Sequence, residues 1–202
     1  MSLFQMKTKP HGIERGGEFL RENYICIGWP GIGDLTHATK DTIRERLAKV
    51  YKYEGQQLST YLGFVNTFVR TMQKGDYVLI SENEYVHLGI IGPYKYVKEF
   101  DNDTDGKCHQ RDVNWLVTVQ KSELNAEVQE LLRNRGTVTQ FKHPIAKAEL
   151  DKLLNKKNKI QSSVSIPKEK LSKALDIVYK AMESENEELR LKAAAILLNY
   201  IK

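Results

Sequence analysis

The chain has 202 residues, enough for one domain of ordinary size and a smaller unit, and its apolar content of 41% suffices for a core. No apolar run approaches the roughly 18 residues of a membrane-spanning helix, and the N-terminus lacks the basic-then-apolar pattern of a secretory signal. Two cysteines, Cys26 and Cys108, do not make a disulfide framework. We therefore expect a cytoplasmic protein with no membrane association.

The net charge of +5 is concentrated in one segment of the chain. Residues 1–141 contain 18 Lys and Arg against 18 Asp and Glu, whereas residues 142–173 contain 9 against 3. That segment includes Lys156, Lys157 and Lys159, in the best candidate for a linker. Such a segment either contacts nucleic-acid phosphates or only keeps the linker solvated, and the sequence leaves both interpretations open.

The first third of the chain predicts one strand and two helices. Residues 1–17 contain Pro10 and three glycines, and we expect little regular structure there. A buried strand over residues 24–28 leads into a Gly-rich loop over residues 29–35. Helices are expected over residues 43–50, capped by Thr39 or Asp41, and from Ser59 or Thr60 to residue 72.

Residues 74–116 predict the middle of a small β-barrel. Apolar or alternating runs over residues 77–80, 85–91, 94–97 and 111–117 are typical of strands. Residues 81–84 and the pair Gly92–Pro93 are predicted turns, and Gly89 indicates a bulge or a close approach of the backbone. Strands joined by short turns favour an antiparallel barrel over a βαβ arrangement.

The last third predicts a change of architecture. A helix over residues 123–134, a closing strand over 138–141 and a helix over 146–154 complete the barrel region. Helices starting near Pro167 and at Ser184 form an αα-hairpin too small to hold a core alone. We therefore predict an α+β fold: an antiparallel β-barrel with flanking helices over 18–145, a basic helix and linker over 146–165, and a C-terminal αα-hairpin over 166–202.

The sequence gives little support for catalysis. It contains no Gly-x-Ser-x-Gly elbow, Walker loop or His-Glu-x-x-His motif, and no histidine is paired with another ligand at metal spacing. The acidic run from Asp101 to Asp112 matches calcium-loop spacing, but its flanks are predicted strands, so an acidic hairpin loop is preferred. We expect no cofactor, no metal and no enzymatic activity. An enzyme acting on a base or nucleotide is a rival, with Asp34 and His109 as its candidate acid or base.

Aromatic residues carry the strongest functional signal. Trp29 lies in a loop rich in Gly and Pro, where a core Trp is less expected, and Tyr94, Tyr96 and Trp115 lie on neighbouring predicted strands. Aromatic faces at the mouth of a barrel can stack a nucleobase, and Asp34 can accept from its exocyclic amine. The alternative is that Trp115 and one tyrosine belong to the core.

Four stretches in this order resemble one family: residues 25–35, 68–78, 89–96 and 109–116. Together they resemble the EVE-like (PUA-superfamily) recognition domain at the N-terminus of Mrr-type and other modification-dependent restriction endonucleases, over residues 18–141. The resemblance implies a PUA-like barrel that flips a modified base from DNA into an aromatic pocket. It implies that Trp29 walls this pocket, that Asp34 reads the base or anchors the loop, and that Tyr94 and Trp115 lie in or just behind it.

The chain departs from that family at its C-terminus, where a helical hairpin replaces the usual nuclease or motor domain. We therefore expect a non-enzymatic reader of modified DNA in a restriction-associated defence or prophage setting. Lys95 and Arg111 near the barrel mouth, with the three linker lysines, are expected to contact phosphates. Residues 166–202 are expected to recruit an effector protein or to self-associate. The alternative function is a protein–protein adaptor that uses the barrel and the hairpin without reading a base.

Overall fold

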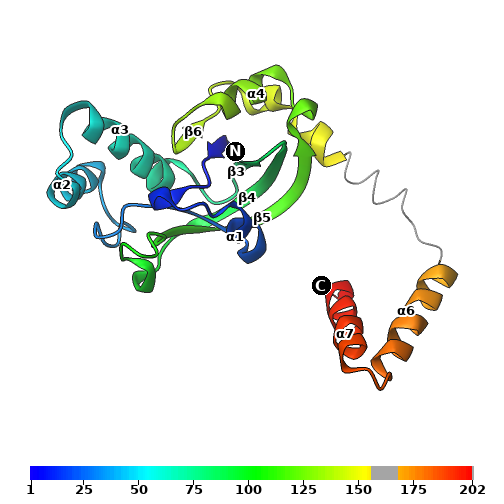
Figure 1. The fold of residues 1–202 in the computed structure, drawn as a ribbon. Coiled ribbons are helices and arrows are strands. Elements are labelled where there is room, and N and C mark those ends of the chain that lie inside the picture. The colour runs from blue at the N-terminus through cyan, green and yellow to red at the C-terminus, as the bar shows by residue number, and fades with distance from the viewer. Residues whose placement is uncertain (156–167, 202) are drawn as a thin grey trace. The chain divides into compact units, whose positions relative to one another are not determined.

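The computed structural model describes residues 1–155 and 168–201. The chain divides into two compact units, Met1–Asn155 and Lys156–Lys202, and each is described by itself (Figure 1). Within the described ranges, no helix is long and apolar enough to cross a membrane.

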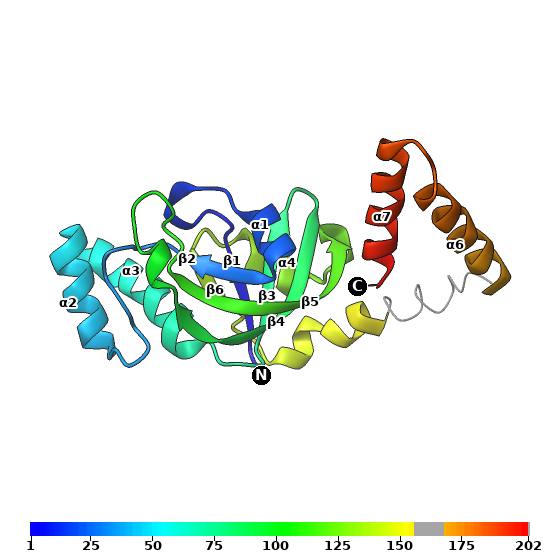
Figure 2. The ribbon, with the colours of Figure 1, turned by 90° about the horizontal axis from the view of Figure 1, so that it is seen from below.

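The first unit is built on a six-stranded sheet that curves into half a barrel (Figure 2). Neighbouring strands run in the order β2-β5-β4-β3-β1-β6. All neighbours are antiparallel except β1 and β3, which are parallel, so the sheet is mixed. The predicted α+β class with a barrel-like sheet is confirmed. The strands are β1 Leu3–Met6, β2 Tyr24–Ile27, β3 Tyr77–Glu82, β4 Tyr85–Tyr96, β5 His109–Gln120 and β6 Val138–Gln140.

The expectation of little regular structure in residues 1–17 is wrong. Residues 3–6 form β1, a fully buried strand that pairs with β3 on one side and with β6 on the other. Four residues are too few to show a period, and both partners lie more than 70 residues away in the sequence. The expected closing strand near residue 138 is confirmed as β6.

The predicted turn at Gly92–Pro93 is also wrong, because β4 continues through it to Tyr96. The register between β4 and β5 shifts between Ile91 and Tyr94, so the two residues form an irregularity inside a long strand. Pro lacks a backbone donor and is tolerated at such places. A second shift follows Leu88, and a Cβ on Gly89 would lie 2.4 Å from a methyl carbon of Val113. The close approach predicted at Gly89 is therefore confirmed.

Helices cover both faces of the sheet and define two cores. Because side chains alternate along a strand, Val78 and Ile80 of β3 point into one core while Leu79 points into the other. The first core lies under α1 Gly16–Glu22, α2 Lys40–Tyr51 and α3 Gly55–Asn66, and the second under α4 Ala126–Arg133. The two layers are visible on either side of the strands in Figure 1.

The two helices predicted in the first third of the chain are present as α2 and α3. Thr39 caps α2 as expected, because its hydroxyl accepts a hydrogen bond from the Thr42 amide at 3.2 Å. Helix α3 starts at Gly55, one turn before the predicted start, and its last turn is a π-helix over Thr67–Thr71.

The second unit is the predicted pair of helices, α6 Lys168–Met182 and α7 Glu187–Ile201. The two helices contact each other. Asn186 rather than Ser184 caps α7, since its side-chain oxygen accepts from the amides of Glu188 and Leu189 at 3.0 and 3.3 Å.

Candidate functional site

The loop that follows β2 has an unusual backbone. Trp29 has a φ of +68°, in the left-handed region that side chains other than Gly rarely adopt. The preceding Gly28 packs directly on the turn Pro10–Gly12, because a Cβ there would lie 2.8 Å from the backbone nitrogen of His11. Such backbone strain persists where the surrounding structure holds it, and it is frequent at binding sites.

Trp29 forms one wall of an aromatic pocket with a volume of about 220 Å³. The other aromatic walls are Tyr51 at the end of α2, Tyr53 after it and Tyr61 in α3, and all four rings are half-buried. The ring centres of Trp29 and Tyr61 are 5.6 Å apart, and those of Tyr53 and Tyr61 are 4.7 Å apart. We call this cavity the aromatic pocket. Its remaining lining residues are Lys9, Pro10, His11, Gly28 and Thr137.

Hydrogen bonds and burial hold the walls of the aromatic pocket in place. The hydroxyl of Tyr51 donates to the Pro30 carbonyl at 2.6 Å, and this bond joins α2 to the loop after β2. Tyr51 stacks on Tyr53 at 5.1 Å between ring centres. Burial raises the pKa of both tyrosines, so both hydroxyls stay protonated at neutral pH. The Tyr51 proton is engaged by the Pro30 carbonyl, which leaves the Tyr53 hydroxyl as the one that can donate to a ligand.

Tyr94 and Tyr96 support the loop and do not line the aromatic pocket. The Tyr94 hydroxyl lies 2.8 Å from Nδ1 of the buried His109 and accepts from the Leu35 amide at 3.4 Å. The Tyr96 hydroxyl donates to Asp101, whose other carboxylate oxygen accepts from the Gly31 amide at 2.6 Å. Because the Leu35 and Gly31 amides belong to the loop that carries Trp29, these bonds fix its position.

Burial lowers the pKa of His109 to about 4, so the ring is neutral at pH 7. In the unfolded chain the same ring binds a proton below a pH of about 6.5. Between these values the unfolded state holds the extra proton, so stability falls as the pH falls. We expect His109 to account for about 3 kcal/mol of unfolding free energy lost between pH 7 and 4, measured by urea titrations.

The histidine prediction has a matched control. His109→Gln removes the titrating group, and its unfolding free energy should vary much less over this pH range. His37 is exposed in the same loop region, and His37→Gln should keep the full pH dependence. An unchanged slope in His109→Gln would contradict the prediction.

Asp34 is exposed and is not among the residues that line the aromatic pocket. One of its carboxylate oxygens accepts from the Thr36 amide at 2.8 Å and from the Thr36 hydroxyl at 2.6 Å. These bonds lower the pKa of Asp34. The backbone carbonyl of Asp34 accepts from Arg46 of α2 at 2.7 Å. This geometry is that of a loop anchor, one of the two roles expected for Asp34.

Arg111 is buried and Trp115 is half-buried against the core, and both hold elements together. The indole nitrogen of Trp115 donates to the Phe19 carbonyl at 3.1 Å and so ties β5 to α1, which matches the core alternative. Arg111 is 2% exposed. Its guanidinium donates to four backbone carbonyls, so the expected contact of Arg111 with phosphate is incompatible with this burial. The four acceptors are Phe68, Val69, Met72 and Gly92.

The other cations expected at phosphates are placed differently. Lys95 is exposed on β4 and forms an ion pair with Asp112 at 2.5 Å. Asp112 lies in β5 and so is not part of the acidic loop that precedes this strand. Within that loop, the side-chain oxygen of Asn102 accepts from the amides of Thr104 and Asp105. No group of three or more His, Cys, Asp or Glu in the described ranges has the geometry of a metal site. Lys156, Lys157 and Lys159 lie outside the described residues.

A basic cluster that the sequence did not single out lies at the end of α4. Lys121, Gln129, Leu132 and Arg133 line a pocket of about 180 Å³. Lys7 joins it, because its ammonium group donates to the Leu132 carbonyl at 3.4 Å. Burial and the charge of Lys121 lower the pKa of Lys7. Lys7, Lys121 and Arg133, which we call the basic cluster, form no ion pair with any carboxylate in the described part of the chain.

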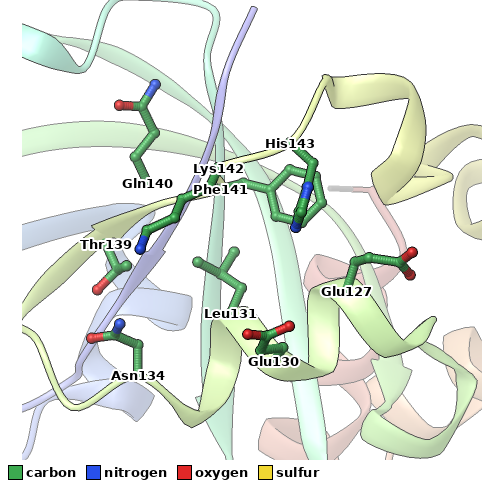
Figure 3. A pocket seen from close by; sticks show the side chains of 9 residues that line it. All are labelled: Glu127, Glu130, Leu131, Asn134, Thr139, Gln140, Phe141, Lys142 and His143. Carbon is green, nitrogen blue, oxygen red and sulfur yellow. The ribbon is translucent and has the colours of Figure 1, made fainter.

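A third pocket lies between α4 and the chain after β6 (Figure 3). Its volume is about 90 Å³, room for a few water molecules and too small for a base. Glu127 and Glu130 line it from α4, and Lys142 and His143 line it from the chain after β6. The mixed charge and small volume make it a weaker candidate than the aromatic pocket.

Sequence reasoning identified Trp29 and missed the three tyrosines that complete the aromatic pocket. Tyr51 and Tyr53 flank the end of one helix and Tyr61 lies in the next, so their meeting depends on how α2 packs on α3. The one feature of the sequence that could have indicated them is the clustering of tyrosines, since three of the ten fall within residues 51–61.

Comparison with known proteins gives one match. Residues 7–142 match the model of a domain of unknown function, DUF8426, and this range spans more than half of the chain. No curated protein and no solved structure matches the chain. The matched range contains Trp29, its three tyrosine neighbours and every strand except β1. The protein therefore belongs to the family defined by the domain of unknown function DUF8426.

Proposed function

We propose that the protein binds DNA and holds one unpaired, modified base in the aromatic pocket. The observation that carries this proposal is the convergence of four half-buried aromatic rings, from three separate segments, on one open pocket. Proteins that read bases outside a duplex stack them on such rings. The hydroxyl of Tyr53 supplies a hydrogen-bond donor near the rings, and the hydroxyl of Tyr51, which donates to the Pro30 carbonyl, can still accept.

The size of the aromatic pocket fits a single base better than a larger ligand. Sites for drug-sized molecules have volumes of about 300–1,000 Å³. The aromatic pocket, at about 220 Å³, lies below that range. A methyl group on the base would add apolar surface that the rings can cover, which favours a methylated base over an unmodified one.

The resemblance to EVE-like domains of the PUA superfamily supports the same proposal. That family combines a barrel-like sheet with an aromatic pocket for a flipped base, and Trp29 occupies a matching position here. In this proposal Tyr94 and Tyr96 act from behind, by fixing the loop that carries Trp29, while Asp34 anchors the same loop. The proposed setting, restriction-associated defence or a prophage, rests on this resemblance alone.

Cations on the first unit provide candidate contacts for DNA phosphates. Lys9 lines the aromatic pocket, and Lys7, two residues before it, belongs to the basic cluster. The Lys7 amide donates to the carbonyl of Thr137, which also lines the aromatic pocket, so this bond between the residue after β1 and the residue before β6 connects the two sites. Because no described carboxylate pairs with the basic cluster, an anion there would relieve the repulsion between its charges.

We propose binding without catalysis. The two residues considered for acid–base chemistry are both engaged elsewhere. Asp34 accepts two hydrogen bonds within its own loop, and His109 is fully buried behind that loop. Neither lines the aromatic pocket. The proposed role is recognition, with any chemistry left to another protein.

The proposal is tested by binding the full chain to matched duplexes that differ at one base: unmodified, methylated or hydroxymethylated. Measurements at several salt concentrations separate the phosphate contribution from the base contribution. We expect one modified duplex to bind at least tenfold more tightly than its unmodified match, with equal salt slopes. Equal binding of all duplexes would contradict base reading.

The adaptor function stays a second proposal because of one observation in the second unit. Six large apolar side chains of α6 and α7 are more than 45% exposed, among them Ile177, Leu191 and Leu198. Exposed apolar side chains in such number mark surfaces that contact other proteins. In the adaptor proposal this surface is the working part of the molecule, and the first unit is its scaffold.

A further inference from the structure

The helix pair of the second unit is too small to bury its own apolar side chains. Each helix has 15 residues, and units below about 40 residues rarely fold without disulfides, metals or oligomerisation. Ala193 is the only side chain of residues 172–198 that is buried. The pair therefore makes one narrow contact and leaves most of its apolar surface uncovered.

Helix α7 is apolar on more sides than α6 can cover. Its charged residues all lie in its first two turns, and from residue 193 to its end Asn199 is the one strongly polar residue. Leu191 and Leu198, each 65% exposed, are seven residues apart and so lie on one face. Leu189 and Ile196, 46% and 58% exposed, form a second stripe with the same spacing. A helix that is apolar on all sides is normally buried in a larger bundle.

Charge along the helix pair favours one particular partner. The turn between the helices and the first turn of α7 carry Glu183, Glu185, Glu187 and Glu188, partly offset by Lys180, Arg190 and Lys192. The start of α6 carries Lys168, Lys170 and Lys173 against the single Glu169. A helix of 15 residues is about 22 Å long, well beyond the screening length of about 8 Å at physiological salt. The pair thus has a weakly acidic end at the turn and a basic end at the start of α6, and the two ends act separately.

We propose that the second unit forms a dimer with a second copy of this chain, as an antiparallel four-helix bundle. In this arrangement the acidic turn of each copy lies beside the basic start of α6 in the other, whereas a parallel arrangement would place acid against acid. Two-fold symmetry satisfies both contacts at once. The stripes of α7 supply the bundle core that one helix pair cannot form.

The dimer is tested on the full chain by sedimentation and by light scattering after gel filtration. We expect a mass twice the 23.3 kDa of one chain at micromolar concentration. The double variant Leu191→Lys, Leu198→Lys should run as a monomer. The matched control is Tyr85→Lys, which places a charge at an apolar side chain of the first unit that is 50% exposed, and it should stay dimeric. A monomeric wild type, or a dimer that survives the double variant, would overturn the proposal.

The antiparallel orientation has its own test by charge reversal. Glu185→Lys with Glu187→Lys should weaken the dimer at least tenfold, because both side chains are exposed and lack an ion pair with any described residue. Adding Lys170→Glu and Lys173→Glu should restore the affinity. Failure of this rescue, with the helical circular dichroism unchanged, would overturn the antiparallel arrangement.

Discussion

Replacing Arg111 by Met should destabilise the first unit by about 3–5 kcal/mol, the largest effect we expect from any single substitution at a residue proposed from the sequence. The last carbonyls of a helix have no partners within it, and the guanidinium supplies donors to those of Phe68, Val69 and Met72. Its charge also lies favourably at that end of the helix dipole. Burial lowers the pKa of Arg111 to about 10, so the group is charged at pH 7, and the charge of Asp76 acts against this lowering. Methionine preserves much of the volume and removes the donors to three buried carbonyls and to the partly buried carbonyl of Gly92.

The measurement is urea unfolding followed by tryptophan fluorescence, since both tryptophans, Trp29 and Trp115, belong to the first unit. Lys95→Met is the matched control. It removes a cation from the neighbouring strand, but Lys95 and Asp112 have side chains 43% and 61% exposed. Exposed pairs of this kind contribute about 0–1 kcal/mol, so the control should change stability little. A loss below about 1 kcal/mol for Arg111→Met would show that the buried hydrogen bonds are not what holds the π-helix to the sheet.

For Arg111, the sequence predicted the strand correctly but not the burial of the side chain. The alternation of polar and apolar residues over 111–117 predicted a half-buried strand, and the strand is there. Which face of β5 meets solvent depends on the π-helix and on β4, and neither contact is local in the sequence. An Arg on a predicted strand is far more often exposed than buried, so the phosphate contact was the natural expectation. The four carbonyls that bury it become visible only in three dimensions.

Dependence on contacts that are distant in the sequence also explains which strands were predicted and which were missed. The hairpin of β3 and β4 and the long strand β5 have strong local patterns and were predicted near their observed positions. Strand β1 has four residues and is stabilised entirely by pairing with distant strands, so no local pattern marks it. Gly92 and Pro93 carry a turn signal in any context, yet here they form an irregularity that the flanking pairs of β4 and β5 enclose. Local chemistry thus predicted the strongly patterned elements, and pairing decided the others.

Trp29→Ala should weaken binding of the preferred duplex about 5- to 150-fold, since stacking of one base on an aromatic ring contributes about 1–3 kcal/mol. The salt slope should stay the same, because Trp29 carries no charge and the number of phosphate contacts does not change. Binding isotherms for the modified and unmodified duplexes, at three or more salt concentrations, measure both quantities. The preference between the two duplexes should shrink, because in the proposed complex the ring contacts the base and not the backbone of the DNA.

The backbone at residue 29 allows a control that separates loss of the ring from distortion of the loop. Glycine adopts a φ of +68° without strain, so Trp29→Gly keeps the loop conformation and relieves its conformational cost. If the ring itself binds the base, Trp29→Gly should lose as much affinity as Trp29→Ala, while Tyr85→Ala, at an exposed ring outside the aromatic pocket, should lose none. Full affinity in both Trp29 variants would refute base stacking there and favour the adaptor, in which the helix pair of the second unit is the binding surface.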